Sequence, residues 1–377
     1  MIRVLADQNL YKIQTFLPEE VELQKFDPSS GLPEDWSSYH GLFIRTVTPV
    51  NEQLLKDSSD GALTFIGSGS AGFDHVDLNA LEQRGITFAH APGCNARAVA
   101  EYVVTALLKW GERNRRELGK LQIGVVGVGN VGSALVKILD NLSLSYRLYD
   151  PPRAEKETDF TSVDLNSLLD SDILTFHTPL TTETDYPTYH WLNKNILKSH
   201  SFDLIINSAR GGVVDEKALL ESHENNRVGS FVIDVWDNEP LFSDELARNA
   251  FIRTPHIAGY SRQAKLRASR MICASLADHF GLTFPPPLPG SQTEIADMFD
   301  ESRFQTLTEL IDHIHPLDEY QQAIDKLIGL PDNKKSTGFA HIRTNRPYRN
   351  EFQYIKIPAY LLDRFPMLRK LNVGRIN

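Results

Sequence analysis

Three polar residues in the second half of the chain have side chains suited to acid–base chemistry. Arg210 precedes two glycines, Glu239 precedes a proline, and His256 follows Thr254-Pro255. A histidine can take up a proton near neutral pH, and a carboxylate on its other ring nitrogen can orient the imidazole. An arginine can bind a substrate carboxylate through two parallel hydrogen bonds. Each residue alone is more often an ordinary loop residue, but together they predict a catalytic set that oxidises an alcohol.

A glycine-rich turn earlier in the chain predicts the oxidant. The apolar run 122–126 leads into Gly127-x-Gly129-x-x-Gly132, a helical segment follows, and a second apolar run ends at Asp150. This strand–turn–helix–strand order is typical of a dinucleotide-binding unit. We expect Gly127 to permit the tight turn, Gly129 to let a pyrophosphate approach the backbone, and Gly132 to allow close packing of the helix.

The same unit indicates which dinucleotide binds. The helix that begins near Asn130 would direct its free N–H groups and positive end at the phosphates. Asp150 lies 18 residues after Gly132, where its carboxylate can accept hydrogen bonds from the ribose diol and would repel a 2′-phosphate. NAD is therefore favoured over NADP. We interpret Arg153 as a solvent-exposed residue rather than a 2′-phosphate ligand. The alternative is a glycine-rich turn that binds no ligand.

Composition excludes several classes of partner. The chain has 377 residues, enough for two or three domains, and a formal net charge of −10. An acidic protein is a poor binder of nucleic acid or of anionic membranes, because phosphates demand clustered Lys and Arg. Cys94 and Cys273 lack the spacing of metal ligands, so we expect no metal site. We also find no signal peptide and no apolar run of membrane-spanning length, which together favour a cytoplasmic protein.

Alternating apolar runs and amphipathic stretches predict two α/β domains with parallel sheets. The first, residues 1–97, has expected strands at 2–6, 41–45, 63–67 and 86–89, with helical patterns at 51–56 and 78–84. The segment 96–116 reads as a long helix that leads into the second domain, residues 98–260. A helix at 261–280 would return the chain to the first domain, so that residues 261–283 complete it.

The strand ends of the second domain coincide with polar residues. Expected strands at 172–177, 204–207 and 230–234 are followed or ended by Thr178, Ser208 and Asp234. Ligands of open α/β sheets bind beyond the carboxyl ends of the strands. We therefore expect these three side chains in the cofactor site.

A proline-rich stretch at 284–290 predicts a linker, and residues 286–377 beyond it form a third region. Its run 354–357 resembles a strand, and 304–313 has a helical pattern, so we expect a small α+β domain. The residues themselves leave dimerisation, substrate gating and effector binding open as its role.

The motifs together resemble those of the D-isomer-specific 2-hydroxyacid dehydrogenases. The resemblance lies in the glycine turn with Asp150, in Arg210-Gly211, in Asp234-Val235-Trp236-x-x-Glu239-Pro240 and in Thr254-Pro255-His256. It narrows to members that act on a phosphorylated 2-hydroxy acid through the segments 45–48, 71–77, 91–96, 150–153, 176–180 and 256–260. It covers essentially the whole chain and is weak beyond about residue 285.

This resemblance implies a fold and a site. The fold would comprise two doubly wound parallel-sheet domains, a flavodoxin-like substrate domain and a Rossmann NAD domain, with the C-terminal domain forming a homodimer. Arg210 and Glu239 would be active-site residues and His256 the proton donor or acceptor. Thr46, Ser70 and Tyr260 would contact substrate, and Tyr260 would also lie against NAD. The expected NAD site comprises Gly127, Gly129, Asn130, Val131, Gly132, Asp150, Thr178, Ser208, Asp234 and Gly259.

A phosphorylated substrate also needs cationic partners. Arg45, at a strand end beside Thr46, is the first candidate, and the others are Arg262, Lys265, Arg267, Arg346 and Arg349. Two alternatives remain open at this point. The protein could oxidise a different acid of the same class, such as 3-phosphoglycerate, or it could be an NAD-sensing binding protein without useful catalysis.

Overall fold

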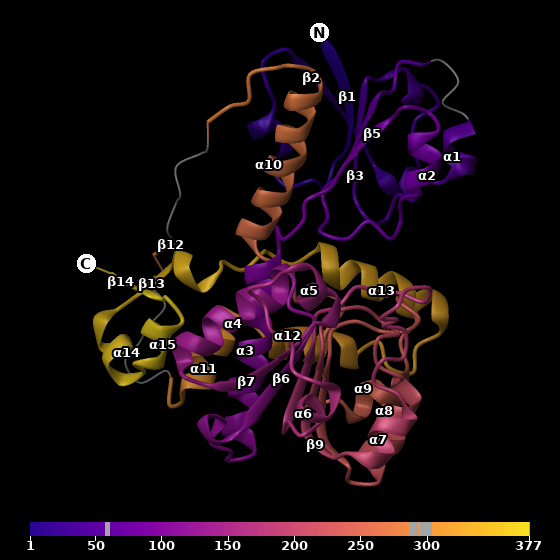
Figure 1. Ribbon diagram of the computed structural model, residues 1–377. Helices are drawn as coiled ribbons and strands as arrows, with labels where there is room; N and C mark the ends of the chain where they lie inside the picture. Colours follow the sequence, from indigo (N-terminus) through magenta and orange to yellow (C-terminus); the bar gives the residue numbers. More distant parts are fainter. Residues whose placement is uncertain (57–60, 287–292, 295–303, 377) are drawn as a thin grey trace. The chain divides into compact units, whose positions relative to one another are not determined.

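The computed structural model describes residues 1–56, 61–286, 293–294 and 304–376 (Figure 1). The chain divides into two compact units. The first consists of Met1–Asn95 and Ser261–Ser291, and the second of Ala96–Tyr260 and Gln292–Asn377. None of the helices in the described ranges is long and apolar enough to cross a membrane.

The first unit is built on a five-stranded sheet in which every neighbouring pair is parallel. Its strands are β1 (Ile2–Asp7), β2 (Val21–Phe26), β3 (Gly41–Ile44), β4 (Phe65–Ser68) and β5 (Thr87–Ala89). The order β2-β1-β3-β4-β5 confirms the flavodoxin-like arrangement. β2 is not among the strands expected from the sequence. It lies at the edge of the sheet, and most of its residues are exposed or half-buried, so it has no continuous apolar run.

Alternate side chains of this sheet face two separate cores, as the period of two in a strand requires. Leu5 and Leu42 point to one core and Phe43 to the other. The second core also contains Ile272 and Leu276 of α10 (Arg262–His279), the helix expected at 261–280. The remaining helices are α1 (Glu52–Lys56) and α2 (Leu78–Glu82), and the short 3₁₀ helices are η1 (Ile13–Phe16), η2 (Pro28–Ser30) and η3 (Trp36–Ser38).

The second unit contains a six-stranded, wholly parallel sheet. Its strands are β6 (Gln122–Val126), β7 (Ser145–Tyr149), β8 (Ile173–Phe176), β9 (Phe202–Asn207), β10 (Val228–Ile233) and β11 (Ile252–Arg253). In the order β11-β10-β9-β8-β6-β7, the chain passes from β6 to β7 on one side and later to β8 on the other. The strand order therefore reverses at β6, and such a switch point is where α/β sheets bind ligands.

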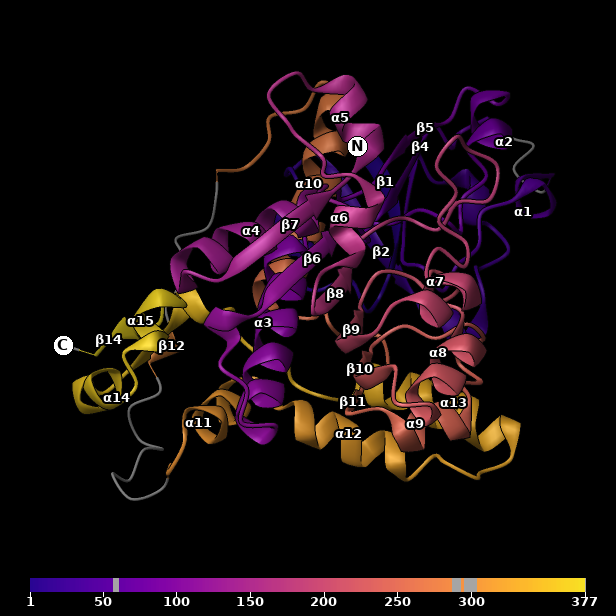
Figure 2. The same cartoon turned by 60° about the horizontal axis from the view of Figure 1, so that its bottom comes forward.

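Helices cover both faces of the second sheet (Figure 2). Ile123 and Leu204 belong to a core shared with α3 (Ala96–Arg113) and α4 (Asn130–Leu142), whereas Phe176 and Ile205 belong to the opposite core. The other helices are α5 (Pro151–Lys156), α6 (Leu165–Leu169), α7 (Lys194–Ser199), α8 (Glu216–Glu224), α9 (Asp244–Asn249) and the 3₁₀ helix η4 (Leu118–Lys120). The long helix expected at 96–116 is thus confirmed as α3.

The C-terminal region packs onto both cores of this second unit. Phe304 and Leu310 join the core of α3 and α4, and Phe339 joins the opposite one. The expected helix and strand are present as α11 (Leu307–Ile314) and β13 (Ile355–Ile357). The other elements are α12 (Leu317–Asp325), α13 (Asp332–Thr344), α14 (Ala359–Arg364), α15 (Met367–Lys370), η5 (Phe352–Tyr354) and two strands parallel to β13, β12 (Thr293–Glu294) and β14 (Gly374–Arg375). Much of the proline-rich stretch at 284–290 lies outside the described residues.

Candidate active site

The glycine turn after β6 is sterically tight where the sequence predicts it to be. Gly127 has a φ of +84°, and a Cβ there would lie 2.8 Å from Thr178 Cγ2. A Cβ on Gly132 would lie 2.2 Å from the Gly127 carbonyl oxygen, so the helix packs directly on the turn. A larger residue at position 132 would force the turn and α4 apart, and one at position 127 would collide with Thr178 and the His177 backbone.

The remaining glycine of the motif, Gly129, faces open space instead. Gly129 is exposed, and a Cβ on it would meet no atom within 4 Å. It precedes Asn130, the first residue of α4, which is also exposed, and Val131 is half-buried. The N-terminal turn of α4 is therefore accessible to a ligand that approaches the backbone at Gly129.

Asp150 follows β7 and lies against this turn. Its Oδ2 atom accepts a hydrogen bond from the Val128 N–H at 2.7 Å, and its Oδ1 atom accepts one from the Arg153 N–H at 3.1 Å. The interpretation of Arg153 as a solvent-exposed residue is wrong. Its guanidinium donates to the Val128 carbonyl at 2.6 Å and pairs with Glu157 at 2.7 Å, so it braces the turn. Nothing in the sequence alone paired Arg153 with a backbone carbonyl of the loop.

Buried polar atoms beyond the neighbouring strands test whether a cofactor fits here. Thr178 and Ser208 follow β8 and β9, and their hydroxyl oxygens are buried without a hydrogen-bond partner among the described residues. The same holds for Nδ1 of His177, whose pKa burial lowers to about 3, so that its ring stays neutral. Buried polar groups are normally satisfied. Orphaned groups beside the glycine turn fit a polar ligand such as NAD.

The Glu239–His256 pair expected from the sequence is present. His256 Nδ1 lies 2.8 Å from Glu239 Oε2, and Glu239 Oε1 accepts a hydrogen bond from the Trp236 N–H at 3.0 Å. Burial raises the pKa of the Glu239 carboxyl, but the charge and hydrogen bond of His256, with the Trp236 N–H, outweigh it and hold that pKa below its usual value. An ionised carboxylate can only accept, so Nδ1 carries the hydrogen, and Nε2 is the ring nitrogen that can exchange a proton with a substrate.

Asp234, at the carboxyl end of β10, holds the loop that presents His256. Its two carboxylate oxygens accept hydrogen bonds from the N–H groups of Ile257 at 2.7 Å and Ala258 at 2.9 Å, and from the Thr254 hydroxyl at 2.6 Å. Burial raises the pKa of Asp234, and these bonds oppose that shift. The structure thus gives this expected NAD residue a second role, because it shapes the turn that continues through Gly259 to Tyr260.

The loop after β9, which carries Arg210, is in close backbone contact with the loop after β10, which carries Glu239. Arg210 follows β9, and a Cβ on the next residue, Gly211, would lie 2.0 Å from the Trp236 carbonyl oxygen. The Arg210 backbone oxygen accepts a hydrogen bond from the Asn207 side chain at 3.1 Å. The three candidates for acid–base chemistry therefore stand in neighbouring loops, after β9, β10 and β11 of one sheet.

The expected substrate-binding residues of the first unit follow the carboxyl ends of two neighbouring strands. Arg45 and Thr46 follow β3, and Ser70 follows its neighbour β4. Arg45 Nε pairs with Asp7 Oδ2 at 2.8 Å, and Asp7 is a fully buried residue at the end of β1. This ion pair spans the β1–β3 switch point of the first sheet. Ser70 Oγ lies 2.7 Å from Ser68 Oγ and donates to the Gly72 carbonyl at 2.8 Å.

Three of the other cationic candidates have protein partners. Arg267 donates to the Cys94 carbonyl at 2.8 Å. Arg346 pairs with Glu319 at 2.6 Å and Arg349 with Glu101 at 2.7 Å. The structure therefore assigns Arg346 and Arg349 to packing of the C-terminal region. Two further residues were not among the candidates expected from the sequence. One is Asp7, and the other is Arg343 of α13, which contacts the Tyr260 ring. For Asp7 a signal existed, since it is an acid that ends a buried strand.

Fold and site together define an NAD-dependent oxidoreductase of the D-isomer-specific 2-hydroxyacid dehydrogenase class. A family model described as "D-isomer specific 2-hydroxyacid dehydrogenase, NAD binding domain" matches residues 96–258. Among solved structures, a Thermus thermophilus protein is 26% identical with a TM-score of 0.63 and covers 76% of this chain and 100% of its own. D-Lactate dehydrogenase from Aquifex aeolicus, complexed with NAD and lactic acid, shares the fold at 24% identity and a TM-score of 0.60, covering 74% and 96%.

Curated relatives narrow the class further. An erythronate-4-phosphate dehydrogenase from Idiomarina loihiensis is 35% identical over 356 residues, which is 93% of this chain and 91% of the relative. One from Bacteroides thetaiotaomicron is 41% identical over 66% of this chain and 73% of the relative. The chain belongs to the erythronate-4-phosphate dehydrogenase family.

Proposed function

We propose that this protein uses NAD to oxidise 4-phospho-D-erythronate to (R)-3-hydroxy-2-oxo-4-phosphobutanoate, a reaction of pyridoxal 5′-phosphate (vitamin B6) biosynthesis. The observation that carries the reaction type is the 2.8 Å contact between Glu239 and His256 in the loops beyond a nucleotide-binding sheet. The name shared by the relatives supports the choice of substrate.

Residues of the second unit bind the cofactor and transfer the proton. The N-terminal turn of α4, Asp150 and the orphaned hydroxyls of Thr178 and Ser208 hold NAD, which supplies a hydride acceptor when bound. His256 Nε2 takes the proton of the C2 hydroxyl while the C2 hydrogen leaves as hydride and the C2–O bond becomes a carbonyl. Glu239 orients the ring and stabilises its protonated form.

The substrate has two charged groups, a carboxylate and a phosphate, and each has an expected cationic partner. Arg210 binds the C1 carboxylate through parallel hydrogen bonds. Arg45 and Thr46 meet the phosphate, with the Arg45 side chain oriented by the buried Asp7 carboxylate. Ser70 and Tyr260 supply further hydroxyl contacts. A positioned acid–base group of this kind typically contributes about 10²–10⁴ in rate.

We also expect a homodimer formed through residues 286–377, and a cytoplasmic location, which the two free cysteines, Cys94 and Cys273, favour. Sedimentation equilibrium tests the dimer, since one chain has a mass of 42.5 kDa. A mass of two chains supports it, and a mass of one chain contradicts it.

The test of the reaction is NADH formation by the purified protein with 4-phospho-D-erythronate, beside 3-phosphoglycerate and D-lactate, with a coupled acceptor in case NADH stays bound. Turnover that prefers the erythronate phosphate is expected. A preference for 3-phosphoglycerate would assign a different acid of the same class. NAD binding without turnover of any acid would favour an NAD sensor.

A further inference from the structure

We propose that Arg343, on helix α13 of the C-terminal region, is a positioning residue of the active site that fixes Tyr260 and supports the Glu239–His256 pair. The proposal deepens the proposed function and rests on it for the choice of substrate. Its consequence is that the C-terminal region takes part in the chemistry of its own chain.

Arg343 contacts the expected substrate residue directly. Its guanidinium carbon lies 5.8 Å from the centre of the Tyr260 ring, within the range of a cation–π contact. The Nε atom of Arg343 is buried and has no partner among the described residues. Tyr348 packs edge-on against the same Tyr260 ring, with centroids 6.0 Å apart. Two residues of the C-terminal region thus fix the orientation of Tyr260.

The charge of Arg343 acts on the catalytic carboxylate. Burial disfavours a charged guanidinium, but Tyr260 and Glu239 hold the pKa of Arg343 above its ordinary value. Arg343 in turn is one of the groups that keep the pKa of Glu239 low. An ionised Glu239 is the form that can accept the Nδ1 hydrogen of His256, so the cation supports the arrangement that the reaction needs.

Helix α13 is fastened to the loop that carries Glu239. Lys335, 7% exposed, pairs with Asp244 at 2.6 Å and donates to the Phe242 carbonyl at 3.2 Å. Phe339, one turn before Arg343, packs against Phe242 with the two rings tilted and their centroids 6.1 Å apart. Because Phe242 and Asp244 follow Glu239 by only a few residues, these contacts fix the position of Arg343 relative to the catalytic loop.

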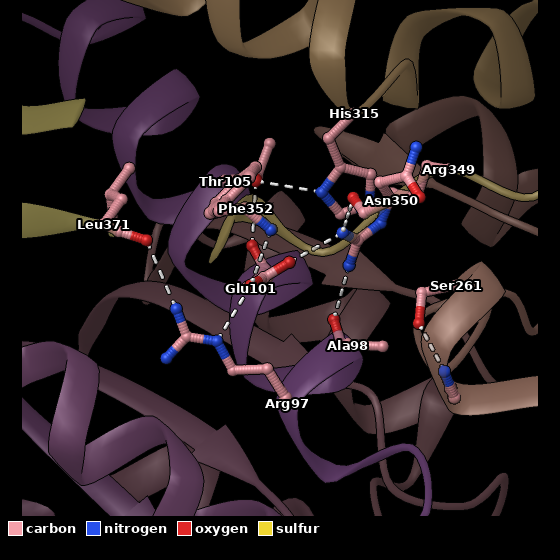
Figure 3. Close-up of polar contacts among 11 residues, drawn as sticks. Arg97, Ala98, Glu101, Thr105, Ser261, His315, Arg349, Asn350, Phe352 and Leu371 are labelled. Carbon is pink, nitrogen blue, oxygen red and sulfur yellow. Dashed lines mark hydrogen bonds and ion pairs between the residues drawn. The ribbon is translucent and has the colours of Figure 1, made fainter. Parts of the chain in front are cut away.

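The segment after Arg343 is anchored as firmly, at the centre of Figure 3. Glu101 of α3 is fully buried and pairs with Arg349 at 2.7 Å and with Arg97 at 2.8 Å. It also accepts the Phe352 N–H at 3.0 Å, and Arg349 donates to the Ala98 carbonyl at 3.0 Å. The chain from 335 to 352 is therefore held on both sides of Arg343, as a precisely placed side chain requires.

Arg346 provides a matched control on the same segment. It is three residues from Arg343, but its partners are Glu319 and the ring of Tyr320, with the Arg346 carbon 5.0 Å from the ring centre. Replacement of either arginine removes one guanidinium from the segment. Only replacement of Arg343 removes a positive charge that acts on the Glu239–His256 pair.

The experiment compares Arg343→Gln, Arg343→Lys and Arg346→Gln with the wild type. Two readouts are the NMR titration of the Glu239 carboxyl in the free enzyme and the pH profile of kcat/KM. Arg343 is one of the groups that lower the pKa of Glu239. In Arg343→Gln, the Glu239 midpoint should therefore move up, by on the order of half a pH unit, and the acid limb of kcat/KM should move with it because the reaction needs an ionised Glu239. Arg343→Lys, which keeps the charge, should leave the midpoint near that of the wild type.

The other charged groups that act on this pair are Asp234 at the end of β10 and Glu216 at the start of α8, and both are retained in every variant. We expect kcat/KM near neutral pH to fall about tenfold or more in Arg343→Gln and less in Arg343→Lys. Arg346→Gln should match the wild type in both readouts.

An unchanged Glu239 midpoint and an unchanged acid limb in folded Arg343→Gln would overturn the proposal, whatever the thermal stability of the variant. If Arg343→Gln does not fold, Arg343→Lys decides: a kcat/KM equal to that of the wild type would overturn the proposal, since lysine lacks the planar fork that holds Tyr260. Failure of the wild type to oxidise 4-phospho-D-erythronate would instead reject the proposed substrate, and the NMR titration would still decide the role of Arg343.

Discussion

His256 adopts a backbone conformation that is rare for a histidine. Its φ is +56°, in the left-handed region that costs energy for residues other than glycine. The surrounding loop stabilises it, because the His256 N–H donates to the Asp234 carbonyl at 2.7 Å and the next two N–H groups converge on the Asp234 carboxylate. This conformation directs the ring towards Glu239, so backbone strain and catalytic geometry belong to the same turn.

Replacement of His256 by asparagine separates its chemistry from its backbone conformation. Asparagine tolerates positive φ, so the turn should survive and the melting temperature should change little. We expect kcat to fall by about 10²–10⁴ because no side chain then takes the hydroxyl proton, while NAD binds as tightly as before. The measurement is steady-state NADH formation with calorimetric NAD titration. Retention of more than about a tenth of the activity would remove His256 from its role as base.

Glu216 should make stability depend on pH near neutrality. Burial, with Asp237, Glu239 and Asp215 nearby, raises the pKa of Glu216 to about 7, although the Asp237 N–H opposes the shift. In the unfolded chain this carboxyl has a pKa of about 4.5. At lower pH it is protonated in both the folded and the unfolded state, so its ionisation does not change the free energy of unfolding. As pH rises from there to about 7, the unfolded chain ionises first, so the native state loses stability and the loss is complete above pH 7.

Glu216→Gln should therefore be more stable than the wild type at pH 8, by on the order of 1 kcal/mol, and nearly equal to it at pH 4.5. The amide oxygen of glutamine can still accept the Asp237 N–H, which the Glu216 carboxylate accepts at 2.9 Å. Denaturant unfolding at the two pH values measures the difference. Equal stability of the two proteins at pH 8 would show that the Glu216 carboxylate is well solvated.

The sequence could identify a functional residue when its partner lies in a nearby motif, but not when the partner is far away along the chain. Glu239 and His256 stand close in sequence within short motifs, and the structure pairs them. Arg153 and Arg349 each have partners that only folding brings near, the Val128 carbonyl and Glu101. Arg343 lies 83 residues beyond Tyr260 without any motif around it, so no pattern in a single sequence linked the two.

At the scale of elements, β6, the glycine turn and α4 form one mechanical unit. Gly132 serves the packing of this unit, and Gly129 is expected to serve its binding of NAD. Gly132→Ala should lower the melting temperature by several degrees, because its Cβ would lie 2.2 Å from the Gly127 carbonyl oxygen and α4 must shift. Gly129→Ala meets no atom within 4 Å, so the fold should keep its stability while NAD affinity falls about tenfold or more.

Thermal unfolding without ligand, followed by NAD titration, distinguishes these two variants. Gly129→Ala that binds NAD as tightly as the wild type would mean that no phosphate approaches the backbone at that residue. Gly132→Ala with an unchanged melting temperature would mean that the turn can relax away from the helix.

Elements with continuous apolar runs were the ones that sequence could predict. β8 is buried along its whole length, and α3 buries most of its residues, so the runs that form them are unambiguous. β2 lies at a sheet edge with a half-buried pattern and escaped detection. The sequence fixes no order among parallel strands, and the flavodoxin-like order was expected only through family resemblance.

At the scale of the whole molecule, the C-terminal region completes the hydrophobic cores of the second unit. Phe304 and Leu310 pack with α3, and Phe339 and Ile342 pack in the core on the opposite face of the sheet. Composition and motifs marked residues 286–377 as a separate region but carried no information on where it docks. Its docking surface is built from scattered apolar residues whose partners lie some 100 to 200 positions earlier in the chain.

A chain that ends at residue 286 should therefore lose cooperative folding of the second unit. Removal of these side chains exposes apolar surface on both faces of the sheet, and each buried large side chain contributes about 1.5–3 kcal/mol, against a total stability of about 5–15 kcal/mol. Near-UV circular dichroism and thermal unfolding of the truncated chain measure the loss. A truncated protein that unfolds cooperatively at the wild-type temperature would show that the region is an independent appendage.

The most direct test of the account is oxidation of 4-phospho-D-erythronate that carries deuterium at C2. The purified protein with NAD should form the 2-oxo product, and the deuterium should appear on the nicotinamide ring of the reduced cofactor, as NMR can show. Turnover with the label lost to water would contradict direct hydride transfer from C2. Absence of turnover, with D-lactate or 3-phosphoglycerate oxidised in its place, would contradict the assigned substrate.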